Sequence, residues 1–316
     1  MPSYSLFDLH CDTALRLFQK SLPLADNSDC HISLSKASYL KNYAQAFAVF
    51  TPSALSDSEG WNQFWAVVDY FRKEVNKNQN AIAFPCTTGA EIAAACAAGK
   101  RAAILAIEDL RILDSDVTRL DSIYACGVRI ITPVWGGDSC IGGAHDTENG
   151  LTPFGRTAVT KLVSLGIIPD ISHASVKTAA EIMEIAAEAG RPAIATHSNS
   201  YAICQHSRNL RDDQFLAIQA LHGIVGISLC VSHLSSTGQA DVDTVIRHVD
   251  HYMELGGADT VCIGCDLDGT NLPTGFHDVS DLYRIADRLA VLGYSEEQID
   301  KIFFTNALQF SKKFLL

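Results

Sequence analysis

Short apolar runs alternate with helical segments along most of this chain of 316 residues, and this alternation limits the possible folds more than any other feature. The runs are continuously apolar, which is typical of strands buried on both faces of a parallel sheet. Helical segments of roughly 10 to 15 residues separate most of them, as in repeated strand-helix-strand units. Eight strands are expected, at residues 4–9, 44–50, 101–108, 127–132, 167–172, 192–196, 223–229 and 260–265.

Eight parallel strands with intervening helices favour a closed (β/α)8 barrel of the TIM type over an open sheet. Helices are expected at 59–78, 91–98, 157–165, 175–189, 212–221, 242–255 and 279–292, with a terminal helix at 295–310. Ser295 and Gln298 occupy the capping-box positions of that terminal helix. No Gly-x-Gly-x-x-Gly follows the first strand, so the best sign of a dinucleotide-binding sheet is missing. The expected fold class is therefore α/β.

Composition agrees with one large core. Apolar residues make up 47% of the chain and are spread along its whole length. No tract rich in Pro, Gly or Ser marks a linker, and a barrel of this length is ordinary. Residues 1–316 are thus expected to form a single domain.

Charge and hydropathy exclude several classes of partner. The net charge of −12 argues against a nucleic-acid surface, which needs clustered Lys and Arg. No apolar run approaches the roughly 20 residues of a membrane helix, and the N-terminus lacks the pattern of a signal peptide. The cysteines fall largely inside apolar runs, and Cys262 and Cys265 have no second pair to complete a zinc site. A cytoplasmic protein with reduced thiols is expected.

Six ionisable residues stand where the expected strands end. Any one of them could be an ordinary capping residue, but a set of six favours a site. The carboxyl ends of all strands in a barrel open on one face, where the active sites of such enzymes are built. These residues are therefore expected to converge. They are His10 and Asp12 at the end of the first strand, Glu108 as the last residue of the third, His173 at the end of the fifth, His197 at the end of the sixth and Asp266 at the end of the eighth.

The residue types in this set favour a transition metal. His10 and Asp12 are two positions apart, so an extended strand turns both side chains to the same face. Three imidazoles with carboxylates are too rich in nitrogen for Mg²⁺ or Ca²⁺ and suit zinc, manganese, cobalt or iron. Glu108 could bridge two ions that share a hydroxide, an arrangement that attacks an amide without a protein nucleophile. No Gly-x-Ser-x-Gly elbow appears, so a serine hydrolase is not favoured.

Several short motifs, taken in order along the chain, resemble those of the membrane (renal) dipeptidase family of the amidohydrolase superfamily. They are Asp8-Leu-His10-Cys-Asp12, Ile107-Glu108, Gly150-Leu-Thr-Pro-Phe-Gly155, Asp170-Ile-Ser-His173, Thr196-His197-Ser198, Arg208-Asn209 and Gly264-Cys-Asp266-Leu-Asp268-Gly269. The resemblance covers nearly the whole chain. It implies a binuclear zinc barrel that hydrolyses dipeptides and a possible homodimer.

The resemblance also implies a role for each matched residue. Asp266 would handle the proton that passes to the leaving amine, and Arg208 would grip the terminal carboxylate of the substrate. For Arg208 the sequence without the resemblance would favour a surface arginine. The metal ligands that the resemblance implies are His10 and Asp12 for one zinc ion, His173 and His197 for the second, and Glu108 as the bridge.

Two positions depart from the family pattern. Mammalian members carry a substrate-binding histidine after the fourth strand, and Trp135 takes that place here. Trp135 is expected to contact the substrate, but it cannot accept a proton as histidine does, which leaves the substrate range open. Asp109 and Leu110 follow Glu108 where the family usually shows glycines, so the rim beside the bridging ligand is expected to differ in shape.

Two assignments among the remaining polar residues stay open. Asp268 shares a strand face with Asp266 and could carry the proton instead, although Asp266 comes first at the strand end. The other histidines have no strand-end setting, and His145 and His206 are the best placed of them to line the mouth of the barrel.

The sequence therefore predicts a metal-dependent dipeptidase with two divalent ions, zinc being the first choice, that acts on a small-molecule substrate. One alternative is another amidohydrolase reaction in the same barrel, on a lactone, a cyclic amide or an amine, which Trp135 keeps open. A second alternative is a non-catalytic barrel that binds a ligand or partner. No nucleic-acid or membrane partner is expected.

Overall fold

Parallel strands form a ring in the computed structural model, which describes residues 4–316, so residues 1–3 of the expected domain lie outside the described part. The strands pair in the order β6-β5-β4-β2-β1-β8-β7, and the short β3, Ile82–Ala83, pairs with β4 outside this path. The strands of the ring are β1 Leu6–Cys11, β2 Tyr43–Phe50, β4 Arg101–Glu108, β5 Val128–Thr132, β6 Ile168–Pro169, β7 Val225–Ile227 and β8 Val261–Ile263.

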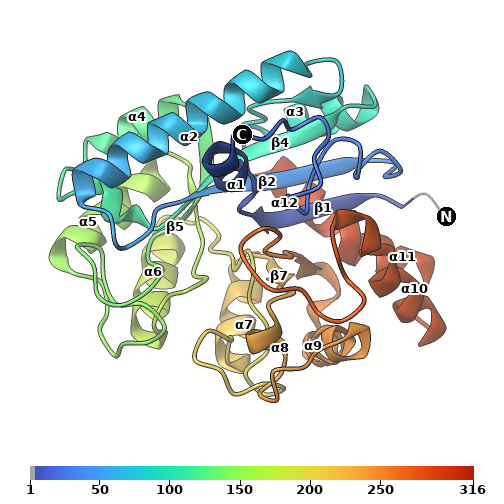
Figure 1. Ribbon diagram of the computed structural model, residues 1–316. Helices are drawn as coiled ribbons and strands as arrows, with labels where there is room; N and C mark the ends of the chain where they lie inside the picture. The colour runs from blue at the N-terminus through green and yellow to red at the C-terminus, as the bar shows by residue number, and fades with distance from the viewer. Residues whose placement is uncertain (1–3) are drawn as a thin grey trace.

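The ring closes through a segment that forms no regular strand. Isolated parallel bridges join Asp170 to Ile194 and Ala195 to Val225, so residues 193–196 lie between β6 and β7. This segment is the sixth of the expected strands, and the predicted (β/α)8 barrel is confirmed. We call β1, β2, β4 and β5 the long arc, and β6, residues 193–196, β7 and β8 the short arc; the long strands are plain in Figure 1.

Helices cover the outside of the ring (Figure 1). The helices expected from the sequence are present, and α1, α4 and α8 occur in addition. The segment expected as a helix at 279–292 begins as a 3-10 turn, Val279–Asp281, before α10. The bounds are α1 Thr13–Lys20, α2 Asp57–Lys77, α3 Gly89–Ala97, α4 Arg119–Ala125, α5 Pro153–Ser164, α6 Val176–Glu188, α7 Asp212–Ala220, α8 Val231–Leu234, α9 Val242–Glu254 and α10 Tyr283–Val291.

The expected terminal helix is divided into α11, Glu296–Asp300, a π-helical turn, Lys301–Thr305, and α12, Asn306–Phe314. Ser295 caps α11 in a capping box with Gln298, as predicted. No helix among residues 4–316 is both long and apolar enough to cross a membrane.

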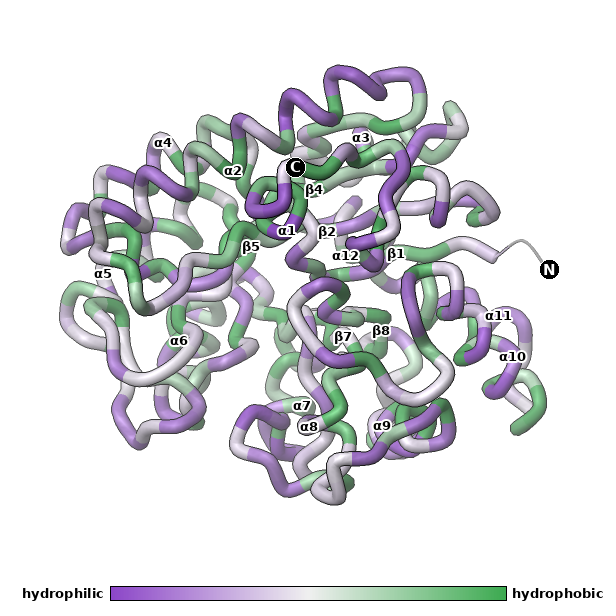
Figure 2. The backbone as a smooth tube through the Cα atoms, in the orientation of Figure 1, coloured by the Kyte–Doolittle hydropathy of each residue, from purple (hydrophilic) through white to green (hydrophobic). Residues whose placement is uncertain are grey.

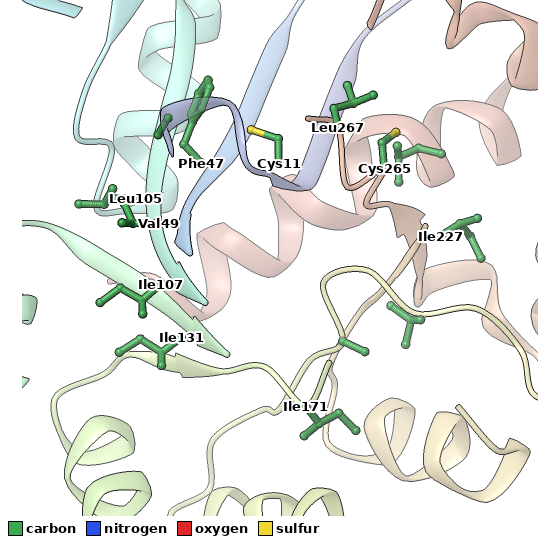
Figure 3. Packing of buried hydrophobic residues seen from close by; sticks show 14 of the residues in the cluster. Cys11, Phe47, Val49, Leu105, Ile107, Ile131, Ile171, Ile227, Cys265 and Leu267 are labelled. Atoms are coloured by element: carbon green, nitrogen blue, oxygen red, sulfur yellow. The ribbon is translucent and has the colours of Figure 1, made fainter. Parts of the chain in front are cut away.

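Two hydrophobic clusters lie on opposite faces of the strands. One takes small or branched side chains from every strand position of the ring, including Ala44 and Ala48 of β2 and Ala106 of β4, and it therefore fills the barrel interior. The other packs Phe47, Ile107 and similar residues toward the helices, as Figure 3 shows around the barrel. Hydropathy follows this division, because the strands are hydrophobic and the outer helices carry hydrophilic stretches (Figure 2).

Close approach of strands in the short arc requires glycine. A Cβ atom placed on Gly264 would lie 1.8 Å from the carbonyl oxygen of Thr196, a backbone atom that cannot move aside. The interior is therefore narrow here, and the side chains that follow at the strand ends come close together.

Candidate metal centre

The carboxyl ends of the barrel strands bring the predicted site residues to one place. A cavity of about 430 Å³ opens there, and the interior of the barrel lies below it. His10 and His197 are each only 1% exposed, with ring centroids 3.8 Å apart. The predicted residues that line the cavity itself are Asp12, Glu108, Trp135, His173, Arg208 and Asp266.

A bulge in β1 turns His10 into the barrel. Phe7 and Leu9 already belong to the interior cluster, so strict alternation would turn His10 outward. The pairing of β1 with β2 shifts register between Asp8 and Cys11, which restores the inward direction for His10. The carboxylate of Asp8 holds this bulge, because its Oδ1 accepts hydrogen bonds from the backbone N–H of His10 at 3.2 Å and of Cys265 at 2.9 Å.

His10 stands among carboxylates. Its Nε2 lies 3.7 Å from Asp12 Oδ2, 3.7 Å from Glu108 Oε2 and 3.9 Å from Asp266 Oδ1. Burial by itself lowers the pKa of His10, but the negative charges of Glu108, Asp12 and Asp266 outweigh burial and raise that pKa to about 10. A position that holds a proton this strongly is one that attracts a positive charge.

The other two predicted histidines approach Glu108 from the short arc. Nε2 of His173 lies 2.9 Å from Glu108 Oε1, and Nε2 of His197 lies 3.3 Å from the same oxygen. The two Nε2 atoms are 3.0 Å apart. Burial lowers the pKa of both histidines well below the usual value, so both rings are neutral.

Hydrogen bonds fix which nitrogen of each ring carries the proton. Nδ1 of His173 lies 3.1 Å from the carbonyl oxygen of Trp135, which can only accept, so this Nδ1 is protonated. Nδ1 of His197 lies 2.7 Å from Thr196 Oγ1, and the Thr196 hydroxyl donates its own hydrogen to Asp170 Oδ2 at 2.5 Å. Nδ1 of His197 is therefore also the donor. Both Nε2 atoms turn lone pairs toward Glu108 Oε1.

The lone pairs of both Nε2 atoms thus meet one carboxylate oxygen. Burial raises the pKa of Glu108 to about 8, because its charged form is costly to bury, and a bound cation would stabilise that form. Nε2 of His10 and Oδ1 of Asp12 are also buried without a hydrogen-bond partner among the described residues. Two groups of ligand atoms lie close enough to hold an ion, His10 with Glu108 and His197, and His10 with Asp12 and Asp266. Nitrogen and carboxylate donors in this mixture suit a transition metal such as zinc.

The backbone around the centre is strained where it supplies side chains. Asp109, His173 and Asp266 have φ angles of 80°, 68° and 63°, in the region that favours glycine. Gly269 makes room for the carboxylates, since a Cβ there would lie 2.1 Å from Asp12 Oδ2 and 2.4 Å from Asp266 Oδ1. The positive φ of Asp109 is one that glycine, the residue expected at this position, adopts without strain.

Asp266 and Asp268 have different surroundings. The carboxylate of Asp268 accepts hydrogen bonds from Thr13 Oγ1 at 2.5 Å and from the backbone N–H of His31 at 2.7 Å, so it ties two loops together. Both carboxylates line the cavity, but Asp266 faces His10 with a side chain that is 13% exposed, whereas that of Asp268 is fully buried. Geometry therefore leaves Asp266 free for chemistry and engages Asp268 in structure.

Arg208 is buried rather than at the surface, with 3% exposure. Its Nη1 donates to Ser198 Oγ at 2.9 Å and its Nη2 to the carbonyl oxygen of His197 at 3.1 Å, while its Nε has no partner among the described residues. It lines the cavity beside the carboxylates.

One of the two histidines expected at the mouth of the barrel does not line the cavity. His145 and His233 line the cavity, whereas His206 does not and instead packs its ring 4.8 Å from that of His233. The sequence alone does not fix which side of its loop the His206 ring takes.

Sequence reasoning missed the residues that hold the site and part of the cavity wall. Asp170 and Thr196 orient His197, and Leu15 and Phe50 line the cavity. Asp170 could have been found as an ionisable residue inside an apolar strand, since a buried carboxylate needs partners. Leu15 and Phe50 carry no signal that distinguishes them from core residues.

Comparison with known proteins places the chain in a family. The family model described as membrane dipeptidase, peptidase family M19, matches residues 1–314. A relative from Klebsiella pneumoniae, described as an uncharacterized protein in the pqqA 5' region, is 34% identical over 240 residues, which cover 72% of this chain and 87% of that protein.

Two solved structures share the fold over 99% of both chains. The dipeptidase AC, a metallopeptidase of family M19, has a TM-score of 0.90 at 25% identity. A metallopeptidase from Rhodobacter sphaeroides, liganded with a phosphinate mimic of the dipeptide L-Ala-D-Ala, has a TM-score of 0.91 at 24% identity. This chain belongs to the membrane dipeptidase family, peptidase family M19, and is a metal-dependent hydrolase of that family.

Proposed function

We propose that this protein hydrolyses the amide bond of small dipeptides with a free carboxylate, using two divalent metal ions, with Zn²⁺ as the first choice. The observation that carries the proposal is the meeting of His173 Nε2, His197 Nε2 and Glu108 Oε1 within 3.3 Å of one another. Burial raises the pKa of Glu108 to about 8, and a bound cation would stabilise the charged form of this carboxylate. Neutral imidazoles held in this way are ready to bind a cation.

The two oxygens of Glu108 support its role as a bridge. Oε2 lies 3.7 Å from Nε2 of His10, and Oε1 lies 2.9 and 3.3 Å from Nε2 of His173 and His197. One ion would take His10 and Asp12 with Glu108, and the second would take His173 and His197 with Glu108. Bound there, two divalent ions acidify water and polarise the carbonyl group of the scissile amide.

The chain itself would supply binding and proton transfer. Asp266 would carry the proton that reaches the leaving amine: both Asp266 and Asp268 line the cavity, but the Asp268 side chain is fully buried and is engaged by Thr13 and His31. Arg208 would bind the substrate carboxylate, since its guanidinium lines the cavity in a buried site where such a charged hydrogen bond is strong. Trp135 lines the same cavity and would also contact the substrate.

We also propose the number of domains and the oligomeric state of the protein. The interior cluster takes residues from all strand positions of the ring, which supports a single domain for residues 1–316. A homodimer is proposed from the family resemblance.

The proposal is tested by metal analysis together with turnover of a panel of dipeptides, lactones and cyclic amides. We expect two transition-metal ions per chain and hydrolysis of dipeptides. The variant Glu108→Gln should lose at least one ion, and Asp266→Asn should keep both ions and lose turnover. Turnover of lactones or cyclic amides alone would favour another amidohydrolase reaction. Full activity in Asp266→Asn would remove Asp266 from the mechanism, and a protein that binds no transition metal would refute the proposal.

A further inference from the structure

We infer that the cavity selects dipeptides whose N-terminal residue carries a large apolar side chain, and that Trp135 is the wall that makes this selection. The inference rests on the proposed function and deepens it. It follows from which side of the cavity holds apolar residues, from what fixes Trp135 in place, and from where a dipeptide would lie.

The large apolar side chains of the cavity come from the long arc. Leu15, Phe50 and Trp135 line it from the segments after β1, β2 and β5, and the same arc also supplies Asp12, Glu108, His145 and Asp146. Arg208 and His233 line it from the short arc. The two sides therefore offer different chemistry to the two ends of one small ligand.

A dipeptide can lie across this cavity in one direction only. Its carboxylate would pair with Arg208 on the short arc, and its amide carbonyl would lie over Glu108 at the centre. The residue on the other side of that amide, which is the N-terminal one, then reaches toward the long arc. Its side chain would contact Leu15, Phe50 and Trp135. Burying an apolar side chain there removes apolar surface from water, which makes the binding free energy more favourable.

Trp135 and Phe50 form a continuous aromatic surface there. Their ring centroids are 4.8 Å apart at an interplanar angle of 52°, within the range of favourable aromatic pairs. Both residues are only half-buried in the ligand-free chain. Large apolar rings left open to a cavity beside a buried charged centre are typical of a ligand-contacting wall.

The backbone that carries Trp135 is held at three successive residues. The carbonyl oxygen of Trp135 accepts from His173 Nδ1 at 3.1 Å, that of Gly136 accepts from Arg111 Nη2 at 3.2 Å, and the N–H of Gly137 donates to Asp146 Oδ1 at 2.9 Å. The wall is therefore preorganised and directly coupled to a proposed metal ligand.

The two positions at which this chain departs from the family pattern are joined by one chain of contacts. Asp109 Oδ2 accepts from Arg111 Nε at 2.5 Å, and the same guanidinium reaches Gly136 beside Trp135. Asp109 is fully buried, so this ion pair is shielded from water. The carboxylate that replaces a glycine near Glu108 thus helps to hold the tryptophan that replaces a histidine, which indicates one altered subsite rather than two unrelated changes.

The experiment compares kcat/KM for leucyl-alanine, glycyl-alanine, alanyl-leucine and alanyl-glycine with the zinc-loaded enzyme. We expect leucyl-alanine to exceed glycyl-alanine by at least about 10-fold, since one or a few methylenes in an apolar pocket give about 10- to 200-fold. The two substrates that differ at the C-terminal residue should differ less than this. The ratio between two substrates cancels incomplete metal loading, because loading multiplies both rates equally.

Trp135→Ala and Trp135→His should reduce the leucyl-to-glycyl ratio to about threefold or less while glycyl-alanine is still hydrolysed. Trp65→Phe is the matched control, because Trp65 lies on α2 among Trp61 and Phe64 and does not line the cavity. Its ratio should equal that of the wild type. An unchanged ratio in both Trp135 variants, or equal kcat/KM values for the wild type, would overturn the inference while leaving the dipeptidase proposal intact. A zinc-loaded wild type that hydrolyses none of the four dipeptides would overturn the proposed function and this inference with it.

Discussion

In the long arc the strands are joined by continuous ladders, such as that of β2 with β4 from Ala44 to Phe50, whereas in the short arc β6, β7 and β8 are only two or three residues long. Buried polar side chains take over the missing contacts. Asn199 pairs with Ser228 as a strand would, because its Nδ2 donates to the carbonyl oxygen of Ser228 and its Oδ1 accepts from the N–H of Ser228, both at 3.0 Å.

Asp170 is the most highly connected of these side chains. Its Oδ1 accepts from the N–H groups of Ser172 and Thr196, both at 2.9 Å, and its Oδ2 accepts from the hydroxyls of Thr132 and Thr196 at 2.6 and 2.5 Å. One carboxylate thus joins β5, the end of β6 and residues 193–196. Ladders suit a scaffold of regular strands, whereas side-chain contacts allow the irregular backbone that His173 and Asp266 require.

The proposed metal ligands come from both arcs. Removing the ions should therefore have the largest effect on activity and stability. His10 lies in β1, Asp12 follows β1 and Glu108 ends β4. His173 and His197 follow segments of the short arc, so bound ions would tie the arcs together. Chelation should abolish dipeptide hydrolysis. Zinc at about 1,000 times its Kd should raise the free energy of unfolding by about 4 kcal/mol.

Hydrogen exchange locates this effect. Zinc should slow amide exchange more in residues 193–200 and 223–229 than in the ladder of β2 and β4, because the short arc has fewer backbone hydrogen bonds of its own. Equal slowing in both arcs would show that the ions stabilise the barrel uniformly. Restoring activity with zinc after chelation is the control for irreversible damage.

The next largest effect, on the free energy of unfolding, should come from replacing Asp170, which we call the anchor of the short arc. Asp170→Asn keeps the shape of the side chain but turns an amide hydrogen toward groups that donate, so we expect a loss of about 3 kcal/mol in the free energy of unfolding of the metal-free protein. Ile107→Val on the long arc should cost about 1 kcal/mol, since it removes one methylene from a well-packed ladder strand. Urea unfolding measures both. A smaller loss in Asp170→Asn than in Ile107→Val would contradict the assignment of Asp170 as the anchor.

The same contrast explains what the sequence could and could not predict. The long strands were expected at nearly their true bounds, because hydrophobic runs determine regular ladders. The strand expected at 167–172 is reduced to Ile168–Pro169, since Asp170 and the left-handed His173 interrupt it. Apolar composition marks a buried segment but does not show whether backbone or side-chain hydrogen bonds hold it.

The convergence of the site residues could also be predicted, because parallel strands in a barrel end on one face. The inward turn of His10 could not be derived fully, since simple alternation from Leu9 would place it outside and only the bulge held by Asp8 corrects this. The capping box of Ser295 was predicted because it depends on neighbours in sequence alone.

Two threonines that contact Asp170 differ in their contact with His197. Thr132 and Thr196 both donate to Asp170 Oδ2, but only Thr196 also accepts from Nδ1 of His197. Thr196→Val should therefore weaken zinc binding about 10- to 100-fold, the usual effect of losing a group that orients a ligand. Thr132→Val should change zinc binding less than about threefold. Calorimetric titration of the metal-free variants measures both.

Stability and rescue separate orientation from general damage in this pair. Thr132→Val should cost about 1 kcal/mol of folding free energy, because it loses one hydroxyl bond to Asp170, and Thr196→Val about 2 kcal/mol, because it also loses the bond to His197. Thr196→Ser, which restores the hydroxyl, should recover zinc binding. Equal weakening of zinc binding in the two valine variants would mean that Asp170, and not the contact with His197, governs the ion.

The smallest expected effect concerns His248, a fully buried side chain on α9 that holds the loop after His197. Its Nδ1 accepts from the N–H of Ser200 at 3.0 Å, and its Nε2 donates to the carbonyl oxygen of Leu234 at 3.0 Å. Burial, aided by Arg247 and opposed by the bond to Leu234, lowers the pKa of His248 to about 4. The unfolded chain has a histidine pKa of about 6.5, so it binds this proton first as the pH falls.

The contribution of His248 to stability is therefore complete above about pH 6.5 and declines as the pH falls toward about 4, by about 1 kcal/mol between about pH 7 and pH 5.5. In His248→Gln, which still offers an acceptor and a donor, this part of the pH dependence should vanish. The quantity to measure is the difference in unfolding free energy between wild type and variant at each pH, in which titrations of all other groups cancel. A difference that stays constant from pH 7 to pH 5.5 would show that His248 can be protonated without opening the loop, and the short arc would then depend on Asp170 and Asn199 more than on its contact with α9.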